Sequence, residues 1–512
     1  MDGWRSRKQK QCLKGFRLVR SRYRHKAVAK EKCLKNDSTL HLIGLLFLLA
    51  TGSFVWFYPA PLCGDMPMHV AVAKALVDLL AHTGAANYPY TLNIVFSSYA
   101  LPEIILAFLV KLFGVIYASK IALTAYAIGF PLSIWFLVSQ IEPEARWAKL
   151  IGFPLTLNYF FHWGFWSYMV GEITVICAIA MSIRHTSTNR SLLIGAPIRV
   201  VTFLMHPAPV IALGIYDTVT VLLDLEHNPK WLNPISWQWK RMSMLWVPTL
   251  LGIAAMSFSF GNSTGPSFAV SWGSAKAQLI QLVRPLFITS QWWESAVPIL
   301  MGLALTSVAC YQTVRSRKRV GILLAALFMV LVGLFLPRDQ FFGNSWEIGA
   351  RIVFIGLILL FSLTALFKKG LAKAVLSWVI ISLTLNLGVS HALWCVHSRS
   401  SERALRVLRE SFTGAKISTE VHPTKDGPSS NVGRHVANWA WCLGYVADAP
   451  NAVAVGDFGP VKYVGLDTAT VREVRIPQGL IVYHPYMLDS LPRPGYRQVL
   501  LRGDDIYTIY KK

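Results

Sequence analysis

The sequence predicts an all-α polytopic transmembrane bundle of about 11 spans, followed by a small extracytoplasmic α/β domain. Of the 512 residues, 54% are apolar and 15% are charged, whereas roughly 25% of the residues in soluble domains are charged. The mean hydropathy is +0.44, and apolar runs of about 20 residues, long enough to cross a bilayer, recur along most of the chain. This composition excludes an ordinary cytosolic enzyme and the disordered and collagen-like classes.

The basic residues gather in short segments between the apolar runs. The formal net charge is +24, from 50 Lys and Arg against 26 Asp and Glu, and 13 of these 50 lie between Arg5 and Lys35. Basic loops between spans are typical of the cytoplasmic side of a membrane, where they also contact anionic lipids. We therefore interpret residues 1–39 as a cytoplasmic tail and expect no nucleic-acid partner. The other basic clusters are 184–199, 240–241, 315–319 and 368–373.

Eleven spans within a transmembrane domain at 40–392 place every one of these clusters on the cytoplasmic side, if the N-terminus is cytoplasmic. This order leaves the loops 60–118, 263–295 and 337–349 outside, together with the chain from 393 onward. The predicted spans are 40–59, 119–139, 148–163, 167–183, 192–206, 207–224, 244–262, 296–314, 320–336, 350–367 and 374–392.

The long first outer loop is predicted to contain two helices that lie on the membrane surface. Apolar residues at helical spacing make the segment 68–82 amphipathic. The segment 98–117 is apolar but contains Pro102, Glu103 and Lys111, which suit an interfacial helix better than one that faces lipid. Counting 98–117 as a span would also place the 315–319 cluster outside.

The chain changes character at 393–512, where charge and proline become more frequent and short β-rich runs appear. We predict a helix over 402–411 and a first strand around 417–421. The runs 498–501 and 506–510 flank a Gly-Asp-Asp sequence and predict a hairpin. These features indicate a small outer α/β domain. Its other predicted strands are 452–455, 471–476 and 480–483.

The first candidate for chemistry is Asp65, which stands just after the first span and four residues before His69. A carboxylate at this point could accept a proton from a hydroxyl group, as a general base does. The structural alternative is that Asp65 caps the 68–82 helix. The spacing leaves both interpretations open.

A second cluster combines an aromatic stretch at 158–168 with the ionisable residues His162 and Glu172. Aromatic residues here are typical of a membrane-interface belt. An ionisable side chain at membrane depth is costly, however, and suggests a functional interior. His206 precedes a proline at the next predicted outer turn, where a helix break with a hydrogen-bonded histidine is the plainer interpretation.

A third cluster lies at the predicted outer mouth of the 350–367 span, where Arg351 follows Glu347 by four residues. Arginine there could bind a lipid phosphate or pyrophosphate through two parallel hydrogen bonds. An ordinary Glu347–Arg351 pair on one helix is the alternative.

Several common site patterns are absent from the sequence: a Walker A loop, G-x-G-x-x-G after a strand, H-E-x-x-H and G-x-S-x-G. The three histidines at 69, 162 and 206 could meet at a divalent metal, but their spacing is not diagnostic and we assign no metal ligand. The seven cysteines form no C-x-x-C, which leaves only a Cys395–Cys442 bridge open on the outer side.

Taken together, these features resemble the C-type (GT-C) membrane glycosyltransferases, which use polyprenyl-phosphate-linked sugars. The resemblance lies in the cytoplasmic N-terminus, an acid early in a long first loop with surface helices, many further spans and an outer C-terminal domain. Gly164 with Phe165, His206 with Pro207, Pro337 with Arg351, and Arg434 with His435 also resemble segments of uncharacterised bacterial inner-membrane proteins placed near these enzymes.

The resemblance implies that Asp65, with His69 nearby, is the catalytic base and that Arg351 binds the donor phosphate with His162 and His206. It implies a polyprenyl-phosphate sugar as donor and a glycan, lipid or protein as acceptor, with these candidate substrate contacts: Glu172, Glu347, His435 and Trp439. Met66 stands where this family often has a second acid, which favours one alternative, a non-catalytic scaffold in envelope polysaccharide assembly. A lipid or solute transporter and another lipid-linked transferase are the remaining alternatives.

Overall fold

The computed structural model divides into two compact units, Met1–Ala50 and Thr51–Lys512. The described part of the first unit is the beginning of an apolar helix that starts at Ser38. Everything below concerns the second unit. The structure describes residues 38–61, 63–81, 90–92, 100–184, 189–227, 246, 250, 274–286, 292–336, 347–411, 416–421, 453–454, 464–466, 479–483, 497–500 and 507–511.

The protein is a multi-pass membrane protein. Within the described ranges, six helices are long and apolar enough to cross a bilayer: Ser38–Phe57, Leu101–Ile141, Trp166–Arg184, Ser295–Ser316, Ile348–Leu366 and Gly370–Cys395. A shorter apolar helix, Val320–Phe335, matches the predicted span 320–336. The predicted span 244–262 lies almost wholly outside the described residues. The total of 11 spans and the orientation of the loops stay predictions.

Both helices predicted for the first loop are present as helices, and the second continues directly into a span; their position on the membrane surface stays a prediction. Helix α2 (Met66–Ala81) matches the amphipathic segment predicted at 68–82. Helix α3 (Ala100–Ile141) joins the predicted 98–117 helix to the predicted 119–139 span through a kink at Gly114. Gly114 has φ 76° and ψ 171°, a conformation that a residue with a Cβ rarely adopts. No loop is needed between the two segments.

The predicted continuous span 148–163 is wrong. The chain there forms a 3₁₀ turn η2 (Trp147–Leu150) and two five-residue helices, α4 (Gly152–Thr156) and α5 (Tyr159–Trp163). Asn158 separates α4 from α5, because its side chain accepts a hydrogen bond from the Phe161 N–H, as a helix N-cap does. Apolar composition alone could not reveal this break.

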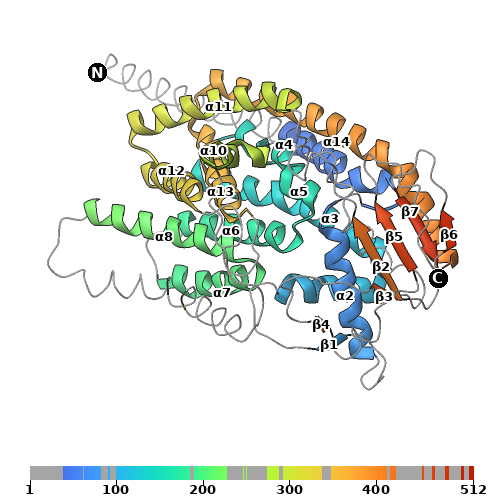
Figure 1. Ribbon diagram of the computed structural model, residues 1–512. Helices are drawn as coiled ribbons and strands as arrows, with labels where there is room; N and C mark the ends of the chain where they lie inside the picture. Colours follow the sequence, from blue (N-terminus) through green and yellow to red (C-terminus); the bar gives the residue numbers. More distant parts are fainter. Residues whose placement is uncertain are drawn as a thin grey trace, which may run out of the picture. The chain divides into compact units, whose positions relative to one another are not determined.

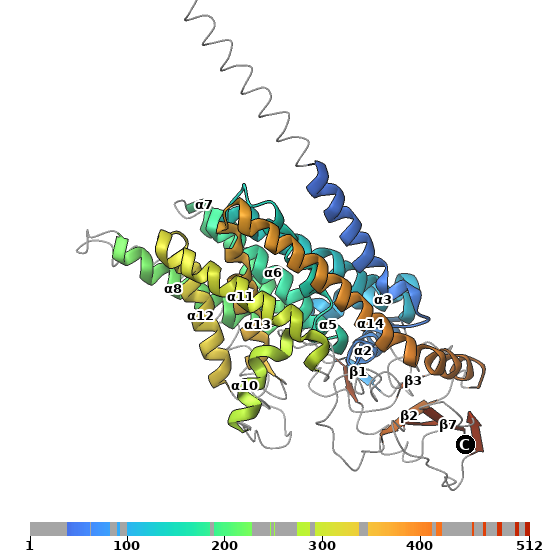
Figure 2. The same ribbon diagram turned by 90° about the horizontal axis from the view of Figure 1, so that it is seen from above.

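The remaining helices form the body around α13 (Ile348–Ser362), in which every residue is buried. Helix α13 lies among α6, α8, α11 and α12 in both views (Figures 1 and 2). The 3₁₀ turn η4 (Leu363–Leu366) extends it. The surrounding elements are α6 (Trp166–Arg184), α7 (Asn189–Met205), α8 (Pro207–His227), α10 (Ala275–Val283), η3 (Arg284–Leu286), α11 (Trp292–Ser316) and α12 (Val320–Phe335).

The faces of α11 and α12 turned away from this core are apolar and exposed, as expected of helices whose solvent is lipid. Their exposed large side chains are Val297, Leu300, Leu303, Val308, Tyr311, Val314, Leu324, Leu327, Phe328, Leu331 and Phe335. By contrast, one charged pair is buried between α7 and α8. Arg199 of α7, which belongs to a predicted cytoplasmic cluster, donates hydrogen bonds of 2.7 to 3.0 Å to the carboxylate of Asp217 on α8.

The last helix, α14 (Lys369–Ser411), is one uninterrupted element of 43 residues. It includes both the predicted span 374–392 and the helix predicted over 402–411, which is present but is the end of α14 and not a separate element. Strands follow it in a five-stranded sheet of order β3-β2-β5-β7-β6. They are β2 (Lys416–Val421), β3 (Val453–Ala454), β5 (Gly479–Tyr483), β6 (Arg497–Leu500) and β7 (Tyr507–Lys511).

Within this sheet, β2 is parallel to β3 and β5, whereas β7 is antiparallel to β5 and β6. The β6–β7 pairing confirms the predicted hairpin. A separate two-stranded ladder joins β1 (Tyr90–Leu92) to β4 (Val464–Leu466). The predicted strand 471–476 lies outside the described residues, and the assignment of 393–512 to a separate outer domain stays a prediction.

Candidate functional site

The site begins where the loop after the first span docks on the turn after α5. The N–H groups of Gly64 and Asp65 donate to the carbonyl oxygens of His162 and Trp163, at 3.2 and 2.6 Å. Gly164 ends α5 with φ 69°, and a Cβ on it would lie 2.7 Å from the Met66 nitrogen. Only glycine therefore permits this approach. Two segments about 100 residues apart are brought together, and Asp65 is held at the start of α2.

Asp65 is partly buried, and its carboxylate lies in the field of two cationic side chains. Removal from water raises the pKa of Asp65 to about 6, against the opposing effects of His69 and Arg351. The carbonyl of Asp65, not its side chain, accepts the first helical hydrogen bond, from the His69 N–H at 3.1 Å. Among the described residues, no backbone N–H is recorded as donating to the Asp65 carboxylate. This speaks against the capping alternative.

His69 is paired with an acid that sequence reasoning did not select as functional. Its Nδ1 lies 2.5 Å from Oε1 of Glu103, in the first turn of α3, and both side chains are buried. Burial alone would lower the pKa of His69, but the carboxylates of Glu103 and Asp65 outweigh it and the pKa is raised. The available signal was an acid within an apolar helix, which we interpreted as evidence for an interfacial position.

Arg351, in the first turn of α13, is buried without a carboxylate salt bridge in the described part of the chain. Its Nη1 lies 2.5 Å from Nε2 of His206, and its guanidinium stands 4.3 Å from the ring centre of Phe165 and 5.4 Å from that of Tyr168. Its Nε has no hydrogen-bond partner among the residues that the structure describes. A guanidinium is charged at every physiological pH, so this geometry suits an anionic ligand.

The histidine beside Arg351 strengthens this interpretation. Nδ1 of His206 accepts a hydrogen bond from the Ala208 N–H at 3.1 Å. A neutral imidazole has one donor and one acceptor nitrogen, so Nε2 then bears the proton. Nη1 of Arg351 and Nε2 of His206 then both present N–H groups at this contact. An anionic oxygen placed beside them could accept from both.

Two other predicted site residues, Glu172 and His162, have partners of their own. Glu172 accepts hydrogen bonds from the Tyr126 and Tyr168 hydroxyls, at 2.9 and 3.5 Å. The ring of His162 contacts α14, with Nε2 at 2.9 Å from the Ser390 hydroxyl and Nδ1 accepting from the Trp394 indole N–H at 3.3 Å. Both ring nitrogens of His162 thus contact α14, and neither is in contact with Arg351 in the described part of the chain.

The Glu347–Arg351 side-chain pair, one of the two interpretations that the sequence left open, is not found among the described residues. Oε1 of Glu347 lies 2.7 Å from Nη1 of Arg284, and the Arg284 guanidinium stands 4.9 Å from the Tyr159 ring centre. Only the backbone joins Glu347 to Arg351, whose N–H donates to the Glu347 carbonyl at 3.1 Å. The remaining candidates, His435 and Trp439, lie outside the described residues.

Neither a metal centre nor a disulfide is found in the described part of the chain. No group of three or more His, Cys, Asp or Glu side chains there is placed to hold a metal ion. Cys395 is a free thiol, and Cys442, its proposed partner, lies outside the described residues.

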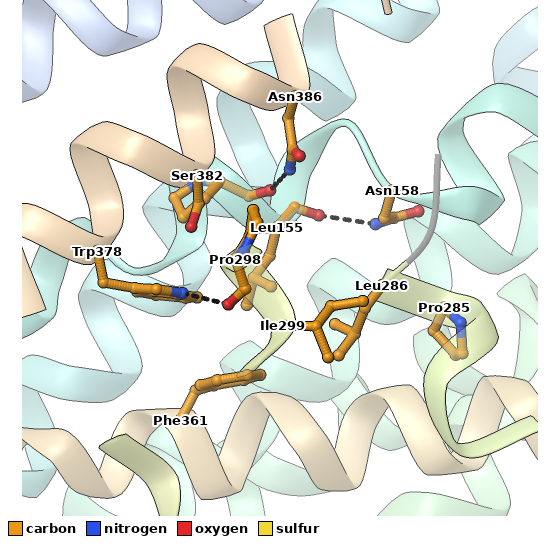
Figure 3. A pocket seen from close by; sticks show the side chains of 11 residues that line it. Leu155, Asn158, Pro285, Leu286, Pro298, Ile299, Phe361, Trp378, Ser382 and Asn386 are labelled. Atoms are coloured by element: carbon orange, nitrogen blue, oxygen red, sulfur yellow. Dashed lines mark hydrogen bonds between the residues drawn. The ribbon is translucent and has the colours of Figure 1, made fainter. Parts of the chain in front are cut away.

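A small cavity lies apart from these groups, between the α4–α5 break and α14 (Figure 3). Its polar side chains mainly satisfy backbone groups: Asn158 donates to the Leu155 carbonyl, Asn386 to Pro154 and Trp378 to Pro298. No acid, base or cationic side chain lines it. The other lining residues are Pro285, Leu286, Ile299, Phe361 and Ser382. We therefore place the chemistry at the Asp65–Arg351 cluster and not in this cavity.

The arrangement of the chain is that of the C-type membrane glycosyltransferase fold, as the resemblance predicted. Solved structures with this fold include ArnT from Cupriavidus metallidurans in the apo state (TM-score 0.54) and bound to undecaprenyl phosphate (TM-score 0.57). Each covers 92% of this chain, over 97% and 98% of its own length, at 11% sequence identity. No protein-family model and no curated protein matches the sequence. At this identity the similarity concerns the fold alone.

Proposed function

We propose that this protein is a membrane glycosyltransferase that moves a sugar from a polyprenyl-phosphate donor to an acceptor hydroxyl at the outer membrane face. The observation that supports this most directly is that the ionisable carboxyl of Asp65 lies within the electrostatic field of Arg351, although the two are 286 positions apart (351 − 65). A base and an anion-binding group close to each other are what such a transfer requires.

In the proposed reaction, the Asp65 carboxylate takes the proton of the acceptor hydroxyl while the acceptor oxygen forms a bond to the anomeric carbon. The bond between that carbon and the phosphate oxygen breaks, and polyprenyl phosphate leaves with one more negative charge. The Arg351 guanidinium and Nε2–H of His206 are placed to stabilise that charge. His162, Glu172 and Glu347 are not required, since each already has partners elsewhere.

The lipid nature of the donor is supported by two facts. One of the solved structures with this fold is ArnT bound to undecaprenyl phosphate. The helices around the site belong to a membrane-spanning body with exposed apolar faces, so a substrate with a hydrocarbon tail can reach the site from the bilayer. The acceptor, whether glycan, lipid or protein, is open.

The test compares wild type, Asp65→Asn and the control Asp78→Asn in lipid nanodiscs. Asp78 lies on the same helix, where its carboxylate pairs with Lys74. Undecaprenyl-phosphate binding is measured by native mass spectrometry, and transfer is measured with a panel of undecaprenyl-phosphate sugars and membrane-extract acceptors. We expect D65N to bind the lipid normally and to lose transfer by ~10²–10⁴-fold, while D78N retains both.

Retained transfer in D65N would remove Asp65 as the base. If the wild type binds undecaprenyl phosphate but transfers no sugar from any donor in the panel, the non-catalytic scaffold becomes the better account. If it neither binds the lipid nor transfers sugar, the proposed function fails.

A further inference from the structure

Glu103 and His69 form a contact that the reaction proposed above does not explain. They come from different helices, 34 positions apart, and their side chains meet at 2.5 Å in a buried setting. The ionisable groups around them come from several elements: Cys63 and Asp65 before or at the start of α2, His206 between α7 and α8, and Arg351 on α13.

A purely structural pair that pins α2 to α3 is the simplest interpretation, but two observations argue for more. Glu103 is 1% exposed, and within the described ranges its second carboxylate oxygen, Oε2, has no hydrogen-bond partner. A buried carboxylate with only one of its two oxygens hydrogen-bonded destabilises the fold. Two apolar side chains could join α2 to α3 without this cost. In addition, the imidazole held by Glu103 is in turn within electrostatic range of Asp65.

We propose that Glu103 is a positioning residue, which accepts the Nδ1–H of His69 and so holds a protonated imidazole beside Asp65. A carboxylate that binds one ring nitrogen fixes both the tautomer and the orientation of the ring. The imidazolium then favours the ionised form of Asp65, which a general base needs. Glu103 thus acts on the reaction through His69, and this inference rests on the proposed role of Asp65.

The predicted consequence is a chain of two electrostatic effects. Without the Glu103 carboxylate, the pKa of His69 should fall, because Glu103 is the largest of the influences that raise it, and His69 then carries less positive charge beside Asp65. Asp65 then loses the larger of the two influences that lower its own pKa. The pKa of Asp65 should therefore rise above its value of about 6, by roughly one unit or more.

The experiment measures the protonation of Asp65 directly and does not depend on knowing the substrate. Dicyclohexylcarbodiimide reacts with protonated carboxyl groups in apolar surroundings, and peptide mass spectrometry locates the adduct. Labelling of Asp65 is followed from pH 5 to 9 in wild type, Glu103→Gln and the control Glu142→Gln. Glu142 follows the far end of α3 and is partly exposed.

We expect the midpoint of Asp65 labelling to move up by about one pH unit in E103Q and not to move in E142Q. His69→Gln should move it similarly, and the double variant should move it no further, because both changes remove the same charge. Glu103→Asp should restore part of the wild-type midpoint.

An unchanged midpoint in folded E103Q would overturn the proposal and leave the pair with a structural role. If E103Q does not purify as a folded protein, H69Q provides the same readout, and an unchanged midpoint there overturns the proposal equally. Failure of the proposed function is a different result: no sugar transfer by the wild type, whatever the labelling midpoints are.

Discussion

Two arginines of this protein are equally buried but have opposite environments. Arg199 is 5% exposed and Arg351 is 6% exposed. The guanidinium of Arg199 is held by both carboxylate oxygens of Asp217 on the neighbouring helix. The guanidinium of Arg351 contacts an imidazole and two aromatic rings, and it forms no salt bridge within the described residues.

The difference separates a charge that completes the fold from one that is available to a ligand. A buried charge costs several kcal/mol unless it is paired. The carboxylate of Asp217 neutralises Arg199. The chain surrounds Arg351 with groups that tolerate a cation but do not neutralise it, although the guanidinium lowers the pKa of the Asp65 carboxyl. In the proposed function, the donor phosphate provides the missing partner.

The largest predicted effect tests the first half of this comparison. Arg199→Met leaves Asp217 buried without its partner and should destabilise the protein by about 3–5 kcal/mol. Thermal unfolding in detergent measures the loss. The double variant R199M/D217L removes both charges and should recover most of the stability. A single variant as stable as wild type would show that the pair is not needed.

A smaller effect of a different kind is expected for Arg351→Met. Because no ion pair within the chain is broken, the melting temperature should stay at or above that of wild type. Undecaprenyl-phosphate binding should weaken by about 1.5–3 kcal/mol, which is roughly 10- to 150-fold. Native mass spectrometry or a titration in nanodiscs measures it. A drop in melting temperature with unchanged binding would make Arg351 a structural residue, as Arg199 is.

The smallest effect is a dependence on pH that acts in opposite directions on activity and stability. A general base works when deprotonated, so transfer should fall as the pH falls below the Asp65 pKa of about 6, to about one tenth at one unit lower. The folded-state pKa of Asp65 is raised above its ordinary value of 3.8, so the folded state binds this proton more readily than the unfolded state. The contribution of Asp65 to stability should therefore increase between pH 6 and 4.

Melting temperatures of wild type and D65N across this pH range isolate that contribution, since other titrating groups are common to both proteins. The difference in melting temperature should change in favour of wild type as the pH falls. A constant difference would mean that Asp65 has an ordinary pKa in the folded protein.

Prediction from the sequence succeeded where the local sequence of one segment is enough to determine its secondary structure. The amphipathic helix at Met66–Ala81, the spans at Trp166–Arg184 and Ile348–Leu366 and the final hairpin all follow from local periodicity or turn chemistry. It failed at 148–163, where Asn158 interrupts an apolar run and forms hydrogen bonds on both sides of the break. It also left the partner of Glu347 open, because that partner, Arg284, comes from another segment.

The sequence by itself determined that this is a membrane protein, where several of its helices lie, and that Asp65, His69, His206 and Arg351 merit attention. Composition and periodicity suffice for this, because transfer of apolar side chains out of water is a property of each segment. Only the tertiary structure decided that these four residues share one site, that Glu103 joins them, and that His162 and Glu347 turn to other partners. Electrostatic and hydrogen-bond energies depend on distances across the fold, and these distances are set by how the helices pack.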